Sequence, residues 1–244
     1  SDIKDAGYPG YTVLGKDKLP DGLQQYFVAE ETLPSSAFIT EGLHIDKADF
    51  IQIIQCHTLE GEGLKARIYQ SDTEKQLIFV FSGTESKILQ RPVRAAENWT
   101  TDFEQGLGLC SDTYKLAIEW VKQLQYHYPD YEVTCTGISL GGGLSQYAAA
   151  YLGLRAYCFN AAWLEGCQLD QIQEGDYSAS IKHIAVDHEI LSVVRKLLIQ
   201  NQLGSVCHIP SYDPTLNDLE RHLTRNTVRS LQEYVAALKN KPAA

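Results

Sequence analysis

The 244-residue sequence has no apolar run approaching the length of about 18 residues that a membrane span requires, so we expect no transmembrane helix. Its first residues, "SDIKDAGYPGY", provide neither a basic head nor an apolar core, so we expect no signal peptide. The chain is therefore expected to be cytoplasmic at synthesis, with later secretion or delivery as an effector left open.

Positive charge is in deficit. The chain has 21 Lys and Arg against 31 Asp and Glu, a formal net charge of −10. This balance argues against a nucleic-acid partner and against unspecific adsorption to anionic membranes.

Paired cysteines and metal motifs are also lacking. The six cysteines are scattered without a CxxC pair, and we expect a reduced, cytosol-like state at synthesis, although an even count leaves disulfides open. The segment Asp187-His188-Glu189 lacks the second His of a zincin motif. We therefore predict no metal and no cofactor.

The elements that can be read from the chain predict one α/β domain over residues 1–244, with a core at 46–240 and an N-terminal extension at 1–45. Strands are expected around 50–56, in a hairpin over 64–81, and at 131–137, 155–162, 180–187 and 205–210. A helix should run from the cap Ser111-Asp112 to about His127, and helical patterns follow at 144–153, 189–200 and 215–239. Helices that alternate with short apolar strands indicate a mostly parallel sheet flanked by helices.

The pattern Gly137-Ile138-Ser139-Leu140-Gly141 fits G-x-S-x-G between an apolar strand and a helix rich in alanine. In that setting a sharp turn raises the serine hydroxyl above the sheet edge, and the helix N-terminus favours a developing anion. A serine that merely caps a helix is the plainer interpretation of the same residues.

A nucleophilic serine needs a base and an orienting acid. Asp187 ends the apolar run of "IKHIAVD", where a parallel strand would place a site residue, although it could instead cap a following helix; Asp213 is the rival acid. If the order is Ser, acid, His, the base is His188, His208 or His222. His188 adjoins the acid and would point away from it. The residues alone do not favour either His208 or His222 as the base.

Several stretches in order resemble the class 3 lipases, a branch of the α/β-hydrolase superfamily. They are "LIFVFSGTES", "NWTTDFEQG", "AIEWVKQLQYHYPDYEVTCTGISLGGGLSQYAA", "CFNAAW", "HIAVDHEILSVV" and "GSVCHIPSYDPTLNDLERHLTRNTVRSL". The resemblance covers roughly residues 50 to 235 and implies an α/β-hydrolase-like fold.

Carried over residue by residue, the resemblance implies Ser139 as nucleophile, Asp187 as acid and His222 as base. It also implies that the backbone N–H groups of Leu140 and Thr84 hold the oxyanion. Two features depart from the family. Ile138 stands where the family usually has His, and the segment at the position of a lid, residues 85–98, is basic, with Lys87, Arg91 and Arg94.

The resemblance therefore implies a serine hydrolase of lipid carboxylic esters, similar to a lipase or phospholipase. Two alternatives stay open: a thioesterase or acyltransferase with the same triad, or a catalytically dead hydrolase fold that binds a lipid or protein. The expected partner is an acyl-ester substrate, and the N-terminal extension could dock a protein.

Overall fold

The computed structural model describes residues 10–30, 56–61, 63–83, 112–164, 166–192 and 202–240. The predicted lid segment, Thr84 and most of the strand expected around 50–56 lie outside these residues. The helix expected at 189–200 is described only as far as Ser192.

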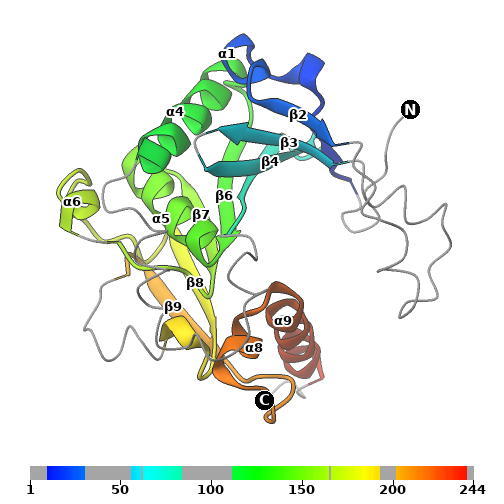
Figure 1. Cartoon of the computed structure of the whole chain (residues 1–244), viewed down its shortest axis with the longest axis vertical. Helices are drawn as coiled ribbons and strands as arrows, with labels where there is room; N and C mark the ends of the chain where they lie inside the picture. Colours follow the sequence, from blue (N-terminus) through cyan, green and yellow to red (C-terminus); the bar gives the residue numbers. More distant parts are fainter. Residues whose placement is uncertain are drawn as a thin grey trace, which may run out of the picture.

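The described strands form one nine-stranded sheet in the order β2-β3-β4-β5-β6-β7-β8-β9, with β1 paired to β4 (Figure 1). The strands are β1 (Thr12–Val13), β2 (Phe27–Glu30), β3 (Cys56–Gly61), β4 (Leu64–Ser71), β5 (Gln76–Phe81), β6 (Glu132–Ile138), β7 (Arg155–Phe159), β8 (Ile181–Val186) and β9 (Ser205–Ile209). Strands β5 to β9 are parallel, whereas β1 to β4 add antiparallel pairings. The predicted sheet is confirmed, and residues 12–30 of the predicted extension contribute two of its strands.

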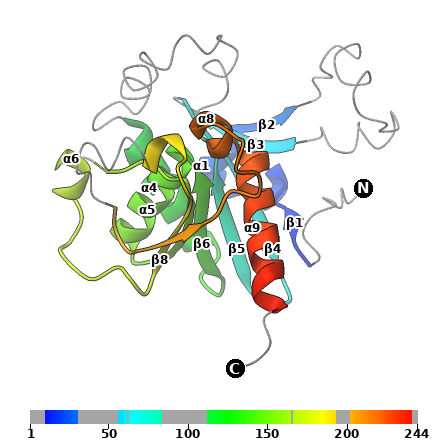
Figure 2. The same ribbon diagram turned by 90° about the horizontal axis from the view of Figure 1, so that it is seen from below.

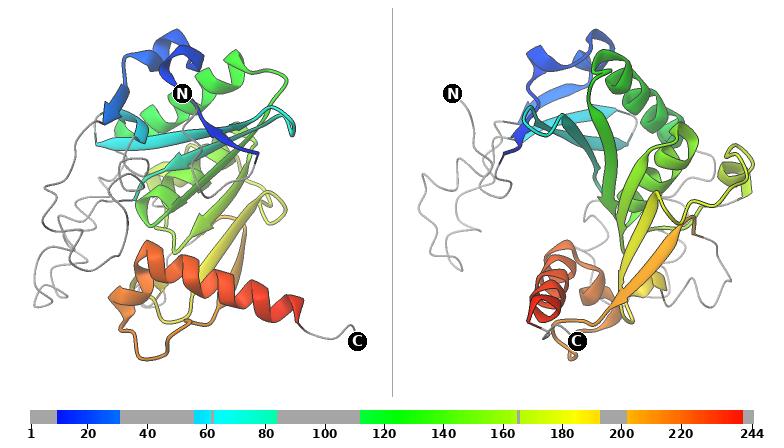
Figure 3. Two further views of the ribbon diagram at one scale, coloured as in Figure 1. Left: turned by 90° about the vertical axis from the view of Figure 1, so that its right-hand side faces the viewer. Right: turned by 180° about the vertical axis from the view of Figure 1, so that it is seen from behind.

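The helices are η1 (Lys16–Lys18), α1 (Asp21–Gln24), α4 (Asp112–His127), α5 (Leu140–Leu152), α6 (Gly166–Leu169), α8 (Asp218–His222) and α9 (Thr224–Lys239). Helices α4 and α5 cover one face of the sheet, and α9 lies on the other side (Figures 2 and 3). The helix predicted to end at about His127 is confirmed as α4, which begins at Asp112, whereas Ser111 of the predicted cap lies outside the described residues.

The core lies between the sheet and the α4–α5 layer, where the fully buried side chains include Phe79, Trp120 and Leu124. Helix α5 is buried along most of its length, because small residues let it pack closely on β6 and β7. The apolar run of β5 predicts a strand covered on both faces. Instead its residues alternate: Leu77, Phe79 and Phe81 are buried, and the residues between them are half-buried.

The helical pattern expected at 215–239 is divided into two helices. Asn217 caps α8 with a reciprocal capping box to Glu220, and Leu223 then adopts an extended conformation before α9 begins. Helix α8 is thereby a short separate arm that ends on His222.

Two further features concern the environment of the chain. None of the helices in the described ranges is long and apolar enough to cross a membrane. Cys167 is disulfide-bonded, so a disulfide, which the even cysteine count left open, is present at this residue. Cys135, Cys158 and Cys207 are free thiols.

Candidate active site

Ser139 occupies a sharp turn between β6 and α5. Its backbone angles, φ 58° and ψ −125°, are rarely adopted by residues other than glycine and store strain at the turn. The turn is held from both sides, because the Ser139 N–H donates to the Phe159 carbonyl at 3.1 Å and the Ser139 carbonyl accepts from the Ala162 N–H at 2.9 Å. The strained serine conformation is therefore fixed by β7 and the loop after it.

The glycines of the motif are required by close backbone approach. A Cβ atom on Gly141 would lie 2.2 Å from the Phe81 carbonyl oxygen, so any side chain there would force β5 and α5 apart. Gly83 approaches from β5 in the same way, since a Cβ atom on it would lie 2.9 Å from the Ile138 carbonyl oxygen and 3.4 Å from Ser139 Cβ. Gly83 itself therefore lies beside the serine.

Helix α5 begins directly after the serine, at Leu140, one of the two predicted oxyanion donors. Its first backbone N–H groups have no partner within the helix and its N-terminus has a positive partial charge, an arrangement that favours an oxyanion. Thr84, the second predicted donor, lies outside the described residues.

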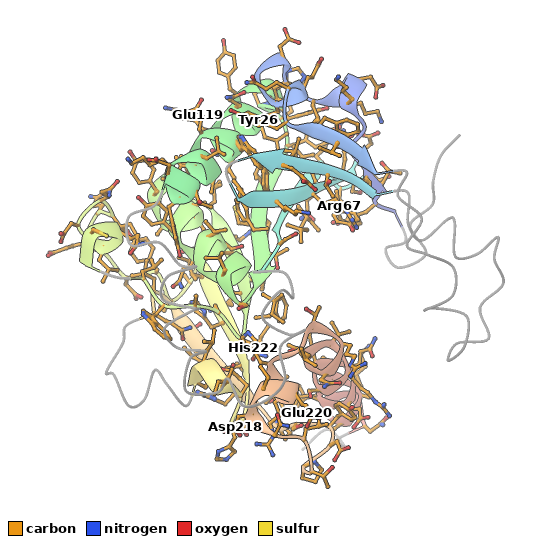
Figure 4. The ribbon with its side chains drawn as sticks, viewed as in Figure 1. Tyr26, Arg67, Glu119, Asp218, Glu220 and His222 are labelled. Carbon is orange, nitrogen blue, oxygen red and sulfur yellow. The ribbon has the colours of Figure 1, made fainter. Side chains whose placement is uncertain are left out.

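His222 forms a buried pair with Glu189. Its Nδ1 lies 2.7 Å from Glu189 Oε2, and the two side chains are 8% and 0% exposed. The same carboxylate also accepts the backbone N–H groups of Leu191 and Ser192, at 3.0 and 2.5 Å. In Figure 4, His222 lies on the side of α8 nearer the central strands, with Asp218 and Glu220 farther from them.

The charge state of Glu189 follows from these contacts. Burial is the largest single effect and raises the pKa of this carboxyl, because the ionised form loses water. The hydrogen bond and charge of His222, with the contributions of Ser192 and Leu191, together outweigh burial and lower the pKa below its ordinary value. Glu189 is therefore an ionised acceptor that orients His222.

The structure corrects the expected partner of His222. Asp187 lies at the end of β8 as expected, but its side chain is 49% exposed and faces Nδ1 of His208 at 3.5 Å. His188 follows with φ 59°, a left-handed turn after which the chain presents Glu189 to His222. Because of this turn, the carboxylate that reaches His222 belongs to a residue three positions beyond Val186, the last residue of β8.

The other candidates from the sequence take different places. His208 lies on the edge strand β9, with its side chain 37% exposed and beside Asp187. Asp213, the rival acid, accepts the backbone N–H and hydroxyl of Thr215 at 2.9 and 2.6 Å. Of the three candidate bases, only His222 is both buried and hydrogen-bonded to a buried carboxylate.

Sequence reasoning missed Glu189 because strand ends mark acids in parallel sheets and Asp187 holds that position. The signal available was the second carboxylate in Asp187-His188-Glu189, just ahead of an apolar run. Because His188 can form a turn between them, either Asp187 or Glu189 could face the interior, and the sequence does not determine which of the two does.

A comparison with known proteins identifies the family to which the chain belongs. The model of a phospholipase-like family, described as Tle-like phospholipase domain, matches residues 28–235. A curated relative named extracellular phospholipase A1, from Serratia liquefaciens, is 30% identical over 198 residues, which are 75% of this chain and 58% of the relative. The chain thus spans less than two thirds of the length of that relative.

Among solved structures, the native Rhizomucor miehei lipase propeptide complex aligns at 16% identity and a TM-score of 0.42, covering 83% of this chain and 72% of the other. The Lip2 lipase from Yarrowia lipolytica aligns at 16% identity and a TM-score of 0.39, covering 63% of this chain and 65% of the other.

Proposed function

Because the chain belongs to the Tle-like phospholipase family, we propose that it is a serine hydrolase of lipid carboxylic esters with Ser139, His222 and Glu189 as its triad. The observation that carries the proposal is the buried hydrogen bond between His222 and Glu189. A dead hydrolase fold needs no buried carboxylate to orient a histidine, whereas a general base does. This pair therefore favours an enzyme over a binding module.

In the proposed reaction, His222 Nε2 removes the proton of the Ser139 hydroxyl while Ser139 Oγ bonds to the acyl carbon. The carbonyl π electrons move to oxygen, and the Leu140 N–H stabilises the resulting oxyanion, with Thr84 as the proposed second donor. Collapse of this intermediate breaks the bond to the alcohol, which leaves with the proton from His222. A water molecule then gives a proton to His222 as its oxygen bonds to the acyl carbon. The bond between this carbon and Ser139 Oγ breaks, Oγ takes the proton back from His222, and the fatty acid leaves.

The proposed substrate is a phospholipid acyl ester. The family description and the name of the Serratia relative support this class. The same triad would serve a thioesterase or an acyltransferase, so the assay below compares the two ester types.

We infer that the protein works in an oxidising compartment. The Cys167 disulfide supports this, because such bonds persist outside the reducing cytosol. The name of the Serratia relative, an extracellular enzyme, agrees with it.

The test uses a fluorophosphonate probe and mixed phospholipid–detergent micelles. Wild-type protein should label and release fatty acid, and Ser139→Ala should do neither while it keeps its circular dichroism spectrum. Release from acyl-thioesters that exceeds release from phospholipids would turn the assignment to a thioesterase. A folded wild-type protein that neither labels nor hydrolyses either ester would refute the proposal.

A further inference from the structure

Asn160 lies directly after β7 and is 1% exposed. Its backbone has φ 40°, in the left-handed region that asparagine tolerates better than most residues. The sequence gives this residue no role beyond its place in "CFNAAW". A buried side chain in an unfavourable backbone conformation has to be held by specific contacts.

The Asn160 side chain uses both ends of its amide. Its Oδ1 accepts the Val186 N–H at 2.9 Å, at the end of β8. Its Nδ2 donates to Thr227 Oγ1 at 2.8 Å and to the Arg221 carbonyl at 3.4 Å. One amide therefore bridges the strand end that leads to Glu189 and the arm that bears His222.

The third catalytic segment is attached through the backbone beside Asn160. The Ser139 N–H donates to the carbonyl of Phe159, the preceding residue, and the Asn160 N–H donates to Ile184 in β8 at 2.9 Å. Arg221 is the immediate neighbour of His222, and Val186 stands three positions before Glu189. Asn160 and its neighbour Phe159 therefore hydrogen-bond to Ser139 itself and to residues one to three positions away from His222 and Glu189.

The Asn160 bridge is one of several contacts that hold the α8 arm, beside the bond from Asn226 Nδ2 to the Glu220 carbonyl at 2.7 Å and the His222–Glu189 pair. Helix α8 has five residues, so it cannot fix its own orientation by helix packing. Helix α9 contacts the edge strand β9, and its Thr227 also reaches Asn160 directly after β7. Asn160 provides a hydrogen-bonded link between this arm and the centre of the parallel sheet, where Ser139 lies.

We propose that Asn160 is a positioning residue that sets His222 relative to Ser139 and Glu189. The inference rests on the proposed hydrolase function for its catalytic consequence, but the geometry it concerns can be measured without turnover. Because misplacement of a catalytic group by about 1 Å costs about 100-fold in rate, loss of the bridge should appear in kcat rather than in KM.

Three variants isolate the bridge. Asn160→Gly removes the amide and leaves a residue that adopts positive φ without strain. Asn160→Asp has the same shape and keeps the acceptor for Val186 but loses both N–H donors. Thr227→Val removes the hydroxyl that Nδ2 contacts.

The matched control is Lys75→Gly. Lys75 has φ 52° and so undergoes the same backbone change, but it lies in the β4–β5 turn, at the opposite end of the parallel strands from Ser139. It should leave kcat within about 2-fold of wild type, because it is far from the site.

The expected kinetic result is a fall in kcat of about 10- to 100-fold for Asn160→Gly and Asn160→Asp, with KM changed less than about 3-fold. Labelling by the fluorophosphonate probe should slow in parallel, because it reports the same activated serine. The double variant Asn160→Gly with Thr227→Val should be no slower than about the slower single variant, since both remove one link. Rates are measured well below each unfolding midpoint, so that lost stability does not count as lost positioning.

A spectroscopic readout is independent of turnover. The proton of His222 Nδ1 in its bond to Glu189 should give a far-downfield NMR signal that disappears in Glu189→Gln, and this signal should broaden or shift in Asn160→Gly. Kinetics and NMR signal both unchanged in a folded Asn160→Gly variant would overturn the proposal. If wild-type protein proved inactive, the hydrolase assignment would fail, and the NMR signal would still decide whether Asn160 positions His222.

Discussion

Glu189 Oε2 lies 2.7 Å from Nδ1 of His222, and the sequence separates the two residues by 33 positions. Two backbone N–H groups hold the same carboxylate, so its orientation does not depend on the histidine alone. Two residues earlier, Asp187 faces His208 in a pair that is partly open to solvent. The chain therefore has two neighbouring carboxylate–histidine pairs, and burial distinguishes them.

The first prediction separates these pairs. Glu189→Gln should lower kcat by about 10³- to 10⁴-fold, because the amide no longer stabilises the imidazolium or selects its tautomer. Asp187→Asn, the matched change in the exposed pair, should alter kcat less than about 3-fold. Steady-state kinetics on a phospholipid substrate measure both. The reverse order of effects would return the acid role to Asp187.

The second prediction concerns stability and pH. The folded-state pKa of Glu189 is lowered, so the ionised carboxylate stabilises the fold above the ordinary glutamate value of about 4.3. That contribution is lost as the pH falls from there through the folded-state pKa. Glu189→Gln has no such proton uptake, so its urea midpoint should fall less steeply than that of wild type below about pH 5. Parallel pH profiles would show that Glu189 is not held in its charged form.

The third prediction tests the close approach at the serine turn. Gly141→Ala should destabilise the fold by at least about 1–3 kcal/mol, because its Cβ meets the backbone of β5. Gly166→Ala is the control, since a Cβ there meets nothing within 4 Å, and it should be neutral or stabilising by up to about 1 kcal/mol. Chemical denaturation gives both values. Equal stability of the two variants would mean that β5 and α5 can separate at little cost.

The fourth prediction concerns the thiols. Cys207 is exposed, whereas burial raises the pKa of Cys135 to about 12 and that of Cys158 above its ordinary value. Because the thiolate is the reactive form, iodoacetamide on the native protein should modify Cys207 and spare the two buried thiols. Cys167 should react only after reduction. Peptide mapping by mass spectrometry reads each site, with unfolded protein as the control for full reactivity.

Much of the fold could be predicted because its signals are local. The apolar strands β5 to β8 and helix α4 form where their patterns place them, and the lipase-like resemblance is confirmed by the family match. The break between α8 and α9 was not predictable, because Leu223 carries no turn signal and its extended conformation belongs to the folded arm. The roles of β1 and β2 were also missed, since they depend on pairing with β4 and β3.

The sequence by itself determined the turn at Ser139. A strand, a helix and glycines at fixed spacing meet within a few residues, and the steric demand for glycine acts between those neighbours and β5. The sequence did not determine which carboxylate is the acid, and only the tertiary structure decided this. Which carboxylate reaches His222 depends on a left-handed turn at His188 and on an arm that folds back and meets the sheet at Asn160. Such contacts join residues dozens of positions apart, and no local pattern in the chain encodes them.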